Sequence, residues 1–311
     1  MVRRALAAAV LLALAGTAQA AEPATCKTVR FAESGWTDVA ATTAVASLIL
    51  KSLGYEPRTS LLSVPAIYAS MKKQQIDAFL GNWMPVMAED RKPFVDDGSV
   101  EVLGANLEGA KYTLAVPTYL YDQGLHDFSD IARFGPRLDW RIHGLEPGND
   151  GNRQLLDLIK SDRFGLGKFQ LVQSSEKAML AAVERAYQAQ QPILFLGWEP
   201  HPMNLRYRIS YLAGGDASFG PNYGGGSVYT NVRAGYERDC PNAGRLLGNL
   251  RFTPEGEGAI MATILERRGT APQAAASWLK ANPGVLDAWL DGVTTFDGMP
   301  ALPAVQRALG S

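Results

Sequence analysis

The sequence has few of the residues on which enzyme active sites usually depend. Its 311 residues include two cysteines and three histidines, at positions 126, 143 and 201. It has no Gly-x-Ser-x-Gly elbow, no His-Glu-x-x-His helix and no Gly-rich phosphate loop. The alternative is a metal pair or an acid/base pair at Glu199 and His201, but Pro200 between them gives a loop-like spacing. We therefore expect no enzyme, no catalytic residues, no metal and no cofactor.

Long apolar runs are also scarce. The run from Ala5 to Ala15 follows Arg3 and Arg4, and a small-x-small motif ends at Ala20. The run is shorter than the about 20 residues that a membrane span needs. This pattern predicts a signal peptide over residues 1–20, cleaved after Ala20, and an exported, soluble mature protein.

Basic and acidic residues are nearly equal in number. With Arg3 and Arg4 set aside, 28 of the 30 basic residues remain against 31 acidic ones, in no long run. Nucleic acid is therefore not an expected partner. A membrane-bound sensor or an adhesive surface protein would need a second apolar segment or a repeat array, and the sequence has neither. The length suggests two domains, at roughly 100 to 200 residues each.

The two cysteines, Cys26 and Cys240, lie far apart. An oxidising compartment favours a disulfide between them, which would close a loop of roughly 215 residues and stabilise the fold by a few kcal/mol at most. The alternative is two buried free thiols. Neither belongs to a Cys-x-x-Cys motif, so redox catalysis is not expected.

Short apolar runs alternate with amphipathic stretches, which is typical of an α/β protein. A first unit is expected to contain strands and helices over residues 28–32, 37–53, 58–62, 63–73 and 76–80. A second unit, starting near Tyr112, is expected to contain strands over 113–116, 141–145, 168–172 and 193–196 and helices over 149–161 and 176–188. Gly220–Gly226 predicts a flexible return to a strand over 227–232 and a mostly helical tail over 242–310. A middle block bracketed by an outer block indicates two lobes with a hinge.

Tryptophan follows glycine and precedes proline at the ends of two predicted strands. Residues 79–85 read Phe-Leu-Gly-Asn-Trp-Met-Pro, and residues 195–200 read Phe-Leu-Gly-Trp-Glu-Pro. Ligands of open α/β sheets bind beyond the carboxyl ends of strands. We therefore expect Trp83 and Trp198 at a binding edge.

Four aromatic residues are expected at that edge: Trp36, Trp83, Tyr112 and Trp198. The alternative for each is ordinary core packing, which we assign to Trp140, Trp278 and Trp289. Several ring faces turned toward one point form a negative surface for a cation that cannot donate hydrogen bonds. Quaternary ammonium is such a cation.

Two polar residues stand near the same edge. Asp38 lies at the start of the first crossover helix, and Asn149 lies in a strand-to-helix loop. The alternative is that both are only helix caps. As binding residues, Asp38 would offer a countercharge or a hydroxyl acceptor, and Asn149 would hold a hydroxyl.

These residues recur in motifs of a known family. The motifs are Ser34-Gly35-Trp36-Thr37-Asp38, Phe79-Leu80-Gly81-Asn82-Trp83-Met84-Pro85, Lys111-Tyr112-Thr113-Leu114-Ala115-Val116-Pro117, Pro147-Gly148-Asn149 and Leu196-Gly197-Trp198-Glu199-Pro200-His201. With them, essentially the whole mature chain resembles the periplasmic choline-binding proteins of ABC importers, within the larger group of glycine betaine and proline betaine binding proteins.

The resemblance implies a two-lobed periplasmic-binding-protein fold of type II, each lobe a mixed sheet flanked by helices. Residues 21–108 and 223–311 would form lobe I and residues 109–222 lobe II. Trp36, Trp83, Tyr112 and Trp198 would form an aromatic box for the trimethylammonium group. Asp38 and Asn149 would meet the choline hydroxyl. Paired Cys26 and Cys240 also fit the resemblance.

The same resemblance implies a monomer in the periplasm that delivers its ligand to an ABC importer permease in the inner membrane. Betaine binders of the group use related tryptophan cages, so a betaine is the alternative ligand. Asp38 would repel a betaine carboxylate, whereas choline carries no anion. We therefore expect choline to bind more tightly than glycine betaine, with acetylcholine as a weaker ligand.

Overall fold

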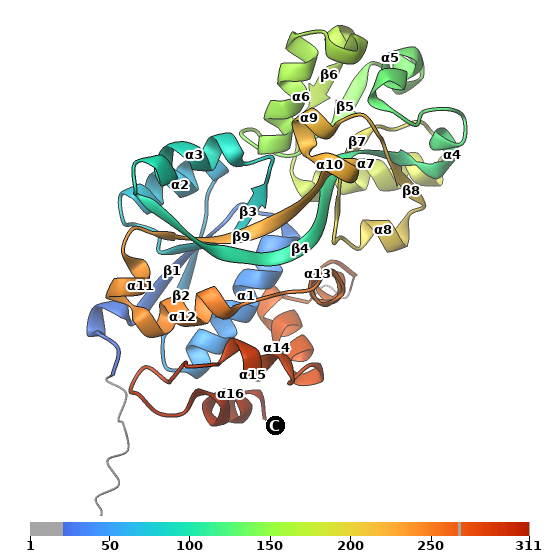
Figure 1. Cartoon of the computed structure of the whole chain (residues 1–311). Coiled ribbons are helices and arrows are strands. Elements are labelled where there is room, and N and C mark those ends of the chain that lie inside the picture. The colour runs from blue at the N-terminus through green and yellow to red at the C-terminus, as the bar shows by residue number, and fades with distance from the viewer. Residues whose placement is uncertain (1–20, 267–268, 311) are drawn as a thin grey trace, which may run out of the picture.

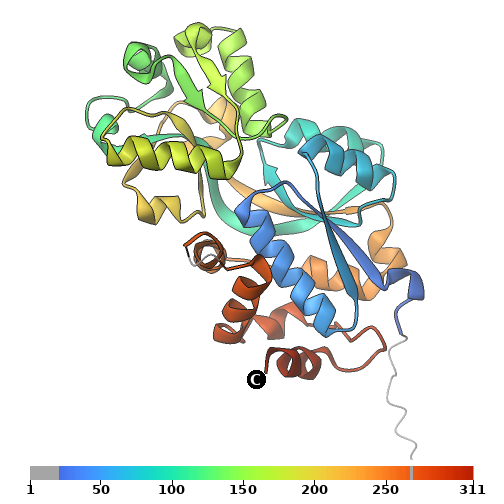
Figure 2. The same ribbon diagram turned by 180° about the vertical axis from the view of Figure 1, so that it is seen from behind.

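A pair of long strands joins the two lobes of the molecule, which Figures 1 and 2 show from opposite sides. The computed structural model describes residues 21–266 and 269–310, so the predicted signal peptide lies outside the described residues. The predicted two-lobed α/β fold is confirmed, with strands of both directions in each lobe and helices around them. Among the described helices, none has both the length and the apolar character that a membrane span requires.

The first lobe is built from the two ends of the chain. Its parallel strands lie in the order β2, β1, β3, and β9 runs antiparallel beside β3. Its elements before the crossing strands are η1 (Ala24–Cys26), β1 (Thr28–Glu33), α1 (Thr37–Ser52), β2 (Glu56–Leu61), α2 (Val64–Lys72), β3 (Ala78–Met84) and α3 (Ala88–Asp96). Those after them are α11 (Tyr236–Asp239), α12 (Pro241–Asn249), α13 (Pro254–Glu266), α14 (Ala271–Ala281), α15 (Val285–Trp289) and α16 (Ala301–Leu309).

The second lobe is built from the middle of the chain. Strand β7 lies antiparallel to the far end of β4 and parallel to β5, which pairs in parallel with β6, while β8 pairs with β4. Its elements are α4 (Thr118–Tyr121), η2 (Phe128–Asp130), α5 (Ile131–Phe134), η3 (Gly135–Leu138), β5 (Arg141–His143), α6 (Asp150–Lys160), η4 (Arg163–Lys168), β6 (Gln170–Val172), α7 (Glu176–Gln188), β7 (Phe195–Glu199), α8 (Met203–Arg206), β8 (Ile209–Tyr211), α9 (Asp216–Phe219) and α10 (Pro221–Gly224).

Strands β4 (Val100–Pro117) and β9 (Gly225–Arg233) cross between the lobes, in green and orange in Figure 1. They are antiparallel from the pair Val100 and Arg233 to the pair Lys111 and Gly225, where β4 also begins to pair with β7. The predicted short strand over 113–116 is wrong in its bounds, because these residues end one strand of 18 residues, β4. All described strands consequently belong to one continuous sheet.

The two tryptophan-proline motifs end two strands in the same way. Trp83 is the penultimate residue of β3, and Trp198 is the penultimate residue of β7. The peptide bonds Met84-Pro85 and Glu199-Pro200 that follow are both cis. The predicted position of both indoles at strand ends is confirmed.

Helix α1 places two of the predicted site residues. Trp36 is its N-cap, in an extended conformation, and Asp38 lies in its first turn, where the helix dipole favours a negative charge. Gly54, at a φ of +95°, follows the end of the helix, as predicted. The apolar face of α1, with Val45 and Ile49 fully buried, packs against α13 and α14. The start of the helix is therefore fixed at the lobe boundary by the core behind it.

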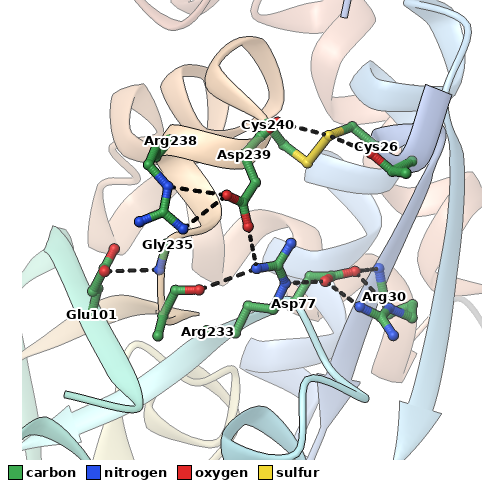
Figure 3. Close-up of polar contacts among 11 residues, drawn as sticks. Cys26, Arg30, Asp77, Glu101, Arg233, Gly235, Arg238, Asp239 and Cys240 are labelled. Atoms are coloured by element: carbon green, nitrogen blue, oxygen red, sulfur yellow. Dashed lines mark hydrogen bonds and ion pairs between the residues drawn. A yellow bond between two sulfur atoms is a disulfide. The ribbon is translucent and has the colours of Figure 1, made fainter. Parts of the chain in front are cut away.

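The predicted disulfide between Cys26 and Cys240 is present, with the Cα atoms 5.6 Å apart. It ties the segment before β1 to α11 and α12 (Figure 3). Beside it, the buried Asp77 carboxylate accepts hydrogen bonds from Arg30 Nε at 2.8 Å and Arg233 Nε at 3.0 Å. These contacts join β1, β3 and β9 far from the lobe boundary, so they support the first lobe and leave the binding edge free.

Candidate functional site

The six predicted site residues come together around one cavity at the lobe boundary. Its empty volume is about 250 Å³, and its lining consists of Trp36, Asp38, Trp83, Tyr112, Leu145, Asn149, Asp150 and Trp198. Trp36, Asp38 and Trp83 come from the first lobe, and the other residues come from the crossing strand β4 or the second lobe. Closing the lobes is therefore what completes the cavity.

The four rings are buried, and Tyr112 packs against two of the indoles. Their exposed fractions are 5% for Trp36, 5% for Trp83, 6% for Tyr112 and 3% for Trp198. Tyr112 stands between two indoles, with its ring centroid 6.0 Å from that of Trp83 and 6.4 Å from that of Trp198. Tyr112 and Trp198 are directly paired residues of β4 and β7, so the sheet register fixes their contact. The four rings belong to the hydrophobic core and line one shared hollow.

Three hydrogen bonds fix the orientation of the rings. Trp83 Nε1 donates to Asp38 Oδ2 at 2.8 Å, and Trp36 Nε1 donates to Glu146 Oε1 at 2.9 Å. The Tyr112 hydroxyl donates to Asn149 Oδ1 at 3.0 Å. Because buried indole and phenol donors need partners, these bonds hold the rings in place.

Gly151 allows the tyrosine to reach its partner. A Cβ at this position would lie 2.2 Å from the Tyr112 hydroxyl oxygen. Only the absence of a side chain lets the first turn of α6 approach the ring so closely. The hydrogen bond from Tyr112 to Asn149 therefore depends on this glycine.

Asn149 is a helix cap, which was the alternative reading of the sequence, and it also lines the cavity. As the N-cap of α6, its Oδ1 accepts from the Asn152 backbone N–H at 3.0 Å, and the same oxygen accepts from Tyr112. Its Nδ2 is buried. The amide thus has a donor without a hydrogen bond of normal geometry, beside the Glu146 carboxyl.

Two carboxyl groups face the cavity with unsatisfied oxygens. Asp38 Oδ1 and both side-chain oxygens of Asp150 are buried without a hydrogen-bond partner among the described residues. Burial, followed by the nearby charge of Glu176, raises the pKa of Asp38 to about 7. Burial also raises the pKa of Asp150 to about 7. The described lining contains no lysine, arginine or histidine to compensate these groups.

The acidic character extends behind the rings. Burial raises the pKa of Glu146, which holds the Trp36 indole, and raises the pKa of Glu257 well above its usual range. Glu257, on α13, is 2% exposed. A cavity with aromatic walls, buried carboxyl groups and no basic side chain in its described lining is suited to a compact monocation, because the ring faces and the acids both favour positive charge.

Sequence reasoning missed Leu145 and Asp150 of the lining and two acids that bond to residues beside it. Asp150 follows Asn149 at the start of a predicted helix, where an aspartate is common for structural reasons alone. Glu146 and Glu176 act on Trp36 and Thr37 across separations of 110 and 139 residues, for which no local pattern exists. The composition of the loop from 146 to 152, with two acids beside the assigned Asn149, was the one available signal.

Within the described residues, one group of potential metal ligands comes together, and it consists of Glu22, Cys26 and Cys240. The two sulfurs are joined in the disulfide, and the Glu22 carboxylate accepts from the backbone N–H groups of Asn242 and Ala243. The atoms of these three residues that could bind a metal are therefore already engaged in structural bonds.

Comparisons with known proteins agree with this geometry. The family model for the substrate binding domain of ABC-type glycine betaine transport systems matches residues 27–281. A solved ABC-transporter choline binding protein in complex with choline is 52% identical, with 93% of this chain and 100% of that chain covered and a TM-score of 0.91. The unliganded, semi-closed form of an ABC-transporter choline binding protein is also 52% identical, covers 92% and 100% of the two chains and has a TM-score of 0.84.

A more distant relative binds a betaine. Lactococcal OpuAC, in its closed conformation with glycine betaine, is 26% identical, covers 85% of this chain and 99% of its own, and has a TM-score of 0.77. The TM-scores are thus higher for the choline complex than for either the semi-closed or the betaine-bound structure.

Proposed function

This chain belongs to the family of substrate-binding domains of ABC-type glycine betaine transport systems, and from that premise we propose that it captures choline between its lobes. One observation carries the proposal: four buried rings from both lobes enclose a cavity whose charged groups are the carboxyls of Asp38 and Asp150. A trimethylammonium group suits ring faces, each of which contributes about 0.5 to 2 kcal/mol when water is excluded. The similarity to a choline complex supports the same ligand.

The hydroxyl of choline has matching groups in the cavity. Asn149 Nδ2 donates to its oxygen, and the unsatisfied Asp38 Oδ1 accepts from its hydrogen. The same binding event places a positive charge beside an aspartate that has no cationic partner in the lining. Trp36, Trp83, Tyr112 and Trp198 form the aromatic box in this proposal.

Glycine betaine is the alternative ligand, because relatives of this family bind it. Its carboxylate would meet Asp38 and Asp150 in a lining without a basic side chain. We expect isothermal titration calorimetry to give a lower dissociation constant for choline than for glycine betaine, with acetylcholine weaker than choline. A tighter complex with glycine betaine would overturn the ranking and assign the protein to betaine capture.

The protein acts in this proposal as a carrier and not as an enzyme. It delivers choline to an ABC importer permease in the inner membrane, and it works as a periplasmic monomer after cleavage behind Ala20. Acetylcholine incubated with the protein should be recovered unchanged. Gel filtration tests the monomer, and mass spectrometry of the exported protein tests the cleavage site.

The two lobes are proposed to comprise residues 21–108 with 223–311, and residues 109–222. The hinge then lies in β4 and β9, where Lys111 pairs with both Gly225 and Glu199 and the partner of β4 changes. Opening would bend these two strands and part the first-lobe rings from Trp198. Hydrogen exchange that slows at this segment when choline binds supports the assignment.

A further inference from the structure

Glu176 spans the boundary between the lobes just outside the aromatic cage. It is the first residue of α7 in the second lobe, and its side chain is 4% exposed. Its Oε2 accepts from the backbone N–H of Thr37 at 2.8 Å, and its Oε1 accepts from the Thr37 hydroxyl at 2.6 Å. Thr37 opens α1 of the first lobe, so both bonds join the two lobes.

These bonds meet a need of helix α1. The first N–H groups of a helix have no partner within it, and the N-cap Trp36 makes no side-chain capping bond. The Glu176 carboxylate supplies both an acceptor and a negative charge at this positive helix end. A helix of the first lobe is therefore capped by an acid of the second lobe, and only while the lobes are closed.

His201 connects the same carboxylate to the other side of the cage. Its Nδ1 accepts from the Met203 backbone N–H at 3.0 Å, so the ring hydrogen sits on Nε2 and points to Glu176 Oε1 at 3.3 Å. The His201 ring also packs edge-on against Trp198, with the centroids 4.6 Å apart. Glu176 thus touches the neighbours of both Trp36 and Trp198.

Among the described residues, other polar contacts also cross the boundary, including an ion pair of Arg153 with Glu89 at 3.8 Å. Arg153 of α6 makes a bidentate contact with Asp90 of α3, at 2.8 and 2.6 Å, and its side chain is 30% exposed. Trp36 donates to Glu146, which shares a lobe with Glu176. Because solvent weakens partly exposed pairs, the buried Glu176 contacts contribute more to closing than the Arg153 pair does.

We propose that Glu176 is a positioning residue that latches the lobes shut around the bound ligand and sets how slowly that ligand leaves. It does not touch the cavity lining; it acts through Thr37 and His201 on Trp36 and Trp198. This inference rests on the proposed function. A latch that forms only in the closed state slows dissociation and leaves the association rate nearly unchanged.

The test compares Glu176→Gln and Glu176→Ala with the wild type, using choline as the probe. Stopped-flow tryptophan fluorescence gives both rates, and calorimetry gives the affinity. At about pH 8.5 Asp38 is ionised in every variant, so the loss of the Glu176 charge does not act through that aspartate. We expect Glu176→Ala to raise the dissociation rate about 10- to 100-fold, and Glu176→Gln, which keeps one acceptor, to raise it less.

A matched control lies on the same helix. Glu184 bonds to Arg206 and Gln188, all within the second lobe, so Glu184→Gln should leave both rates at wild-type values. Thr37→Val removes the hydroxyl donor on the opposite lobe. Its effect should be strongly non-additive with that of Glu176→Gln, because the two substitutions break the same contact.

Lobe separation gives a readout that needs no ligand. Spin labels at Met299→Cys and Leu205→Cys, exposed positions of the first and second lobe, report the distance between the lobes. The ligand-free Glu176→Ala protein should be more open than the ligand-free wild type. A wild type that binds no quaternary ammonium compound would refute the proposed function alone, whereas unchanged dissociation rates and unchanged lobe separation in Glu176→Ala would refute the latch.

Discussion

Replacing Asp38 by asparagine should weaken choline binding and remove most of its pH dependence. The carboxylate faces the cavity without a cationic partner, so a bound quaternary nitrogen becomes its counter-ion. At a separation of about 5 Å and an effective dielectric constant of about 20, their attraction is about 3 kcal/mol, or roughly a hundredfold in affinity. Asp38→Asn keeps the size and the acceptor for Trp83, so the loss reports mainly charge.

The pH dependence follows from the raised pKa of the same group. In the free protein the pKa of Asp38 is about 7. The cation favours the ionised form, so tight binding is present above about pH 7 and is lost as the pH falls through that value. Near pH 5, two units below, affinity should have dropped about a hundredfold, to the level of Asp38→Asn. Binding near neutral pH should also release protons.

Calorimetry between about pH 5 and pH 8.5, in buffers of different ionisation enthalpy, measures the affinity and the released protons together. Asp150 lines the same cavity and also has a pKa of about 7. The Asp150→Asn variant therefore shows how much of the pH dependence of choline affinity comes from Asp150 and how much from Asp38. The choline affinity of a variant with both Asp38→Asn and Asp150→Asn should stay constant over this pH range. A wild-type affinity that stays constant over that range would refute the electrostatic argument.

Three further changes test other parts of the structure. Trp83→Ala should weaken choline binding by about 1 to 3 kcal/mol in a fluorescence titration, because it removes a cage wall and the donor to Asp38. Gly151→Ala should lower choline affinity, since its Cβ would collide with the Tyr112 hydroxyl. Cys26→Ser should lower the melting temperature by removing a link that contributes about 2 to 5 kcal/mol to the free energy of unfolding, with choline affinity unchanged.

Each of these changes has a control and an opposing result. Trp140→Ala removes an indole that packs on Phe169 in the second lobe, so it should affect stability and not affinity. Gly148→Ala adds a Cβ with no atom within 4 Å, although its φ of +86° makes the residue strained, so it separates backbone strain from the Tyr112 collision. Normal choline binding by Trp83→Ala, or a Cys26→Ser variant as stable as the wild type, would contradict the assigned roles.

The sequence pattern predicted those helices and strands whose bounds are marked by residues within or next to them. Helix α1 has an apolar face and a terminal glycine, and the structure gives Thr37–Ser52 where 37–53 was expected. Strand β4 lacks such a signal, since Glu101, Glu108 and two glycines interrupt it before Tyr112. Its length is set by pairing with β9, a contact between segments more than 100 residues apart. Tertiary context of this kind overrides local propensity.

The four rings and Asp38 were predictable from the sequence, and the other acidic residues around the cavity were not. Tryptophan beside proline at a strand end is visible in a single sequence, and all four rings meet as expected. An aspartate or glutamate has the same local pattern whether it is a solvated cap or a buried group. Only the structure shows that Asp150 and Glu176 are buried, at exposed fractions of 0% and 4%.

Charge links ligand choice to closure of the lobes. Asp38 is only 3% exposed when the cavity is formed, and among the described side chains Trp83 alone donates a hydrogen bond to its carboxylate. Closing without a ligand therefore requires either a proton on this carboxyl or a buried, uncompensated charge, which is unfavourable. A quaternary monocation removes that penalty, because it supplies the missing charge without needing hydrogen-bond acceptors. A zwitterion supplies the same nitrogen together with a carboxylate, so it compensates Asp38 less, and the closed state should favour choline over betaines by that difference.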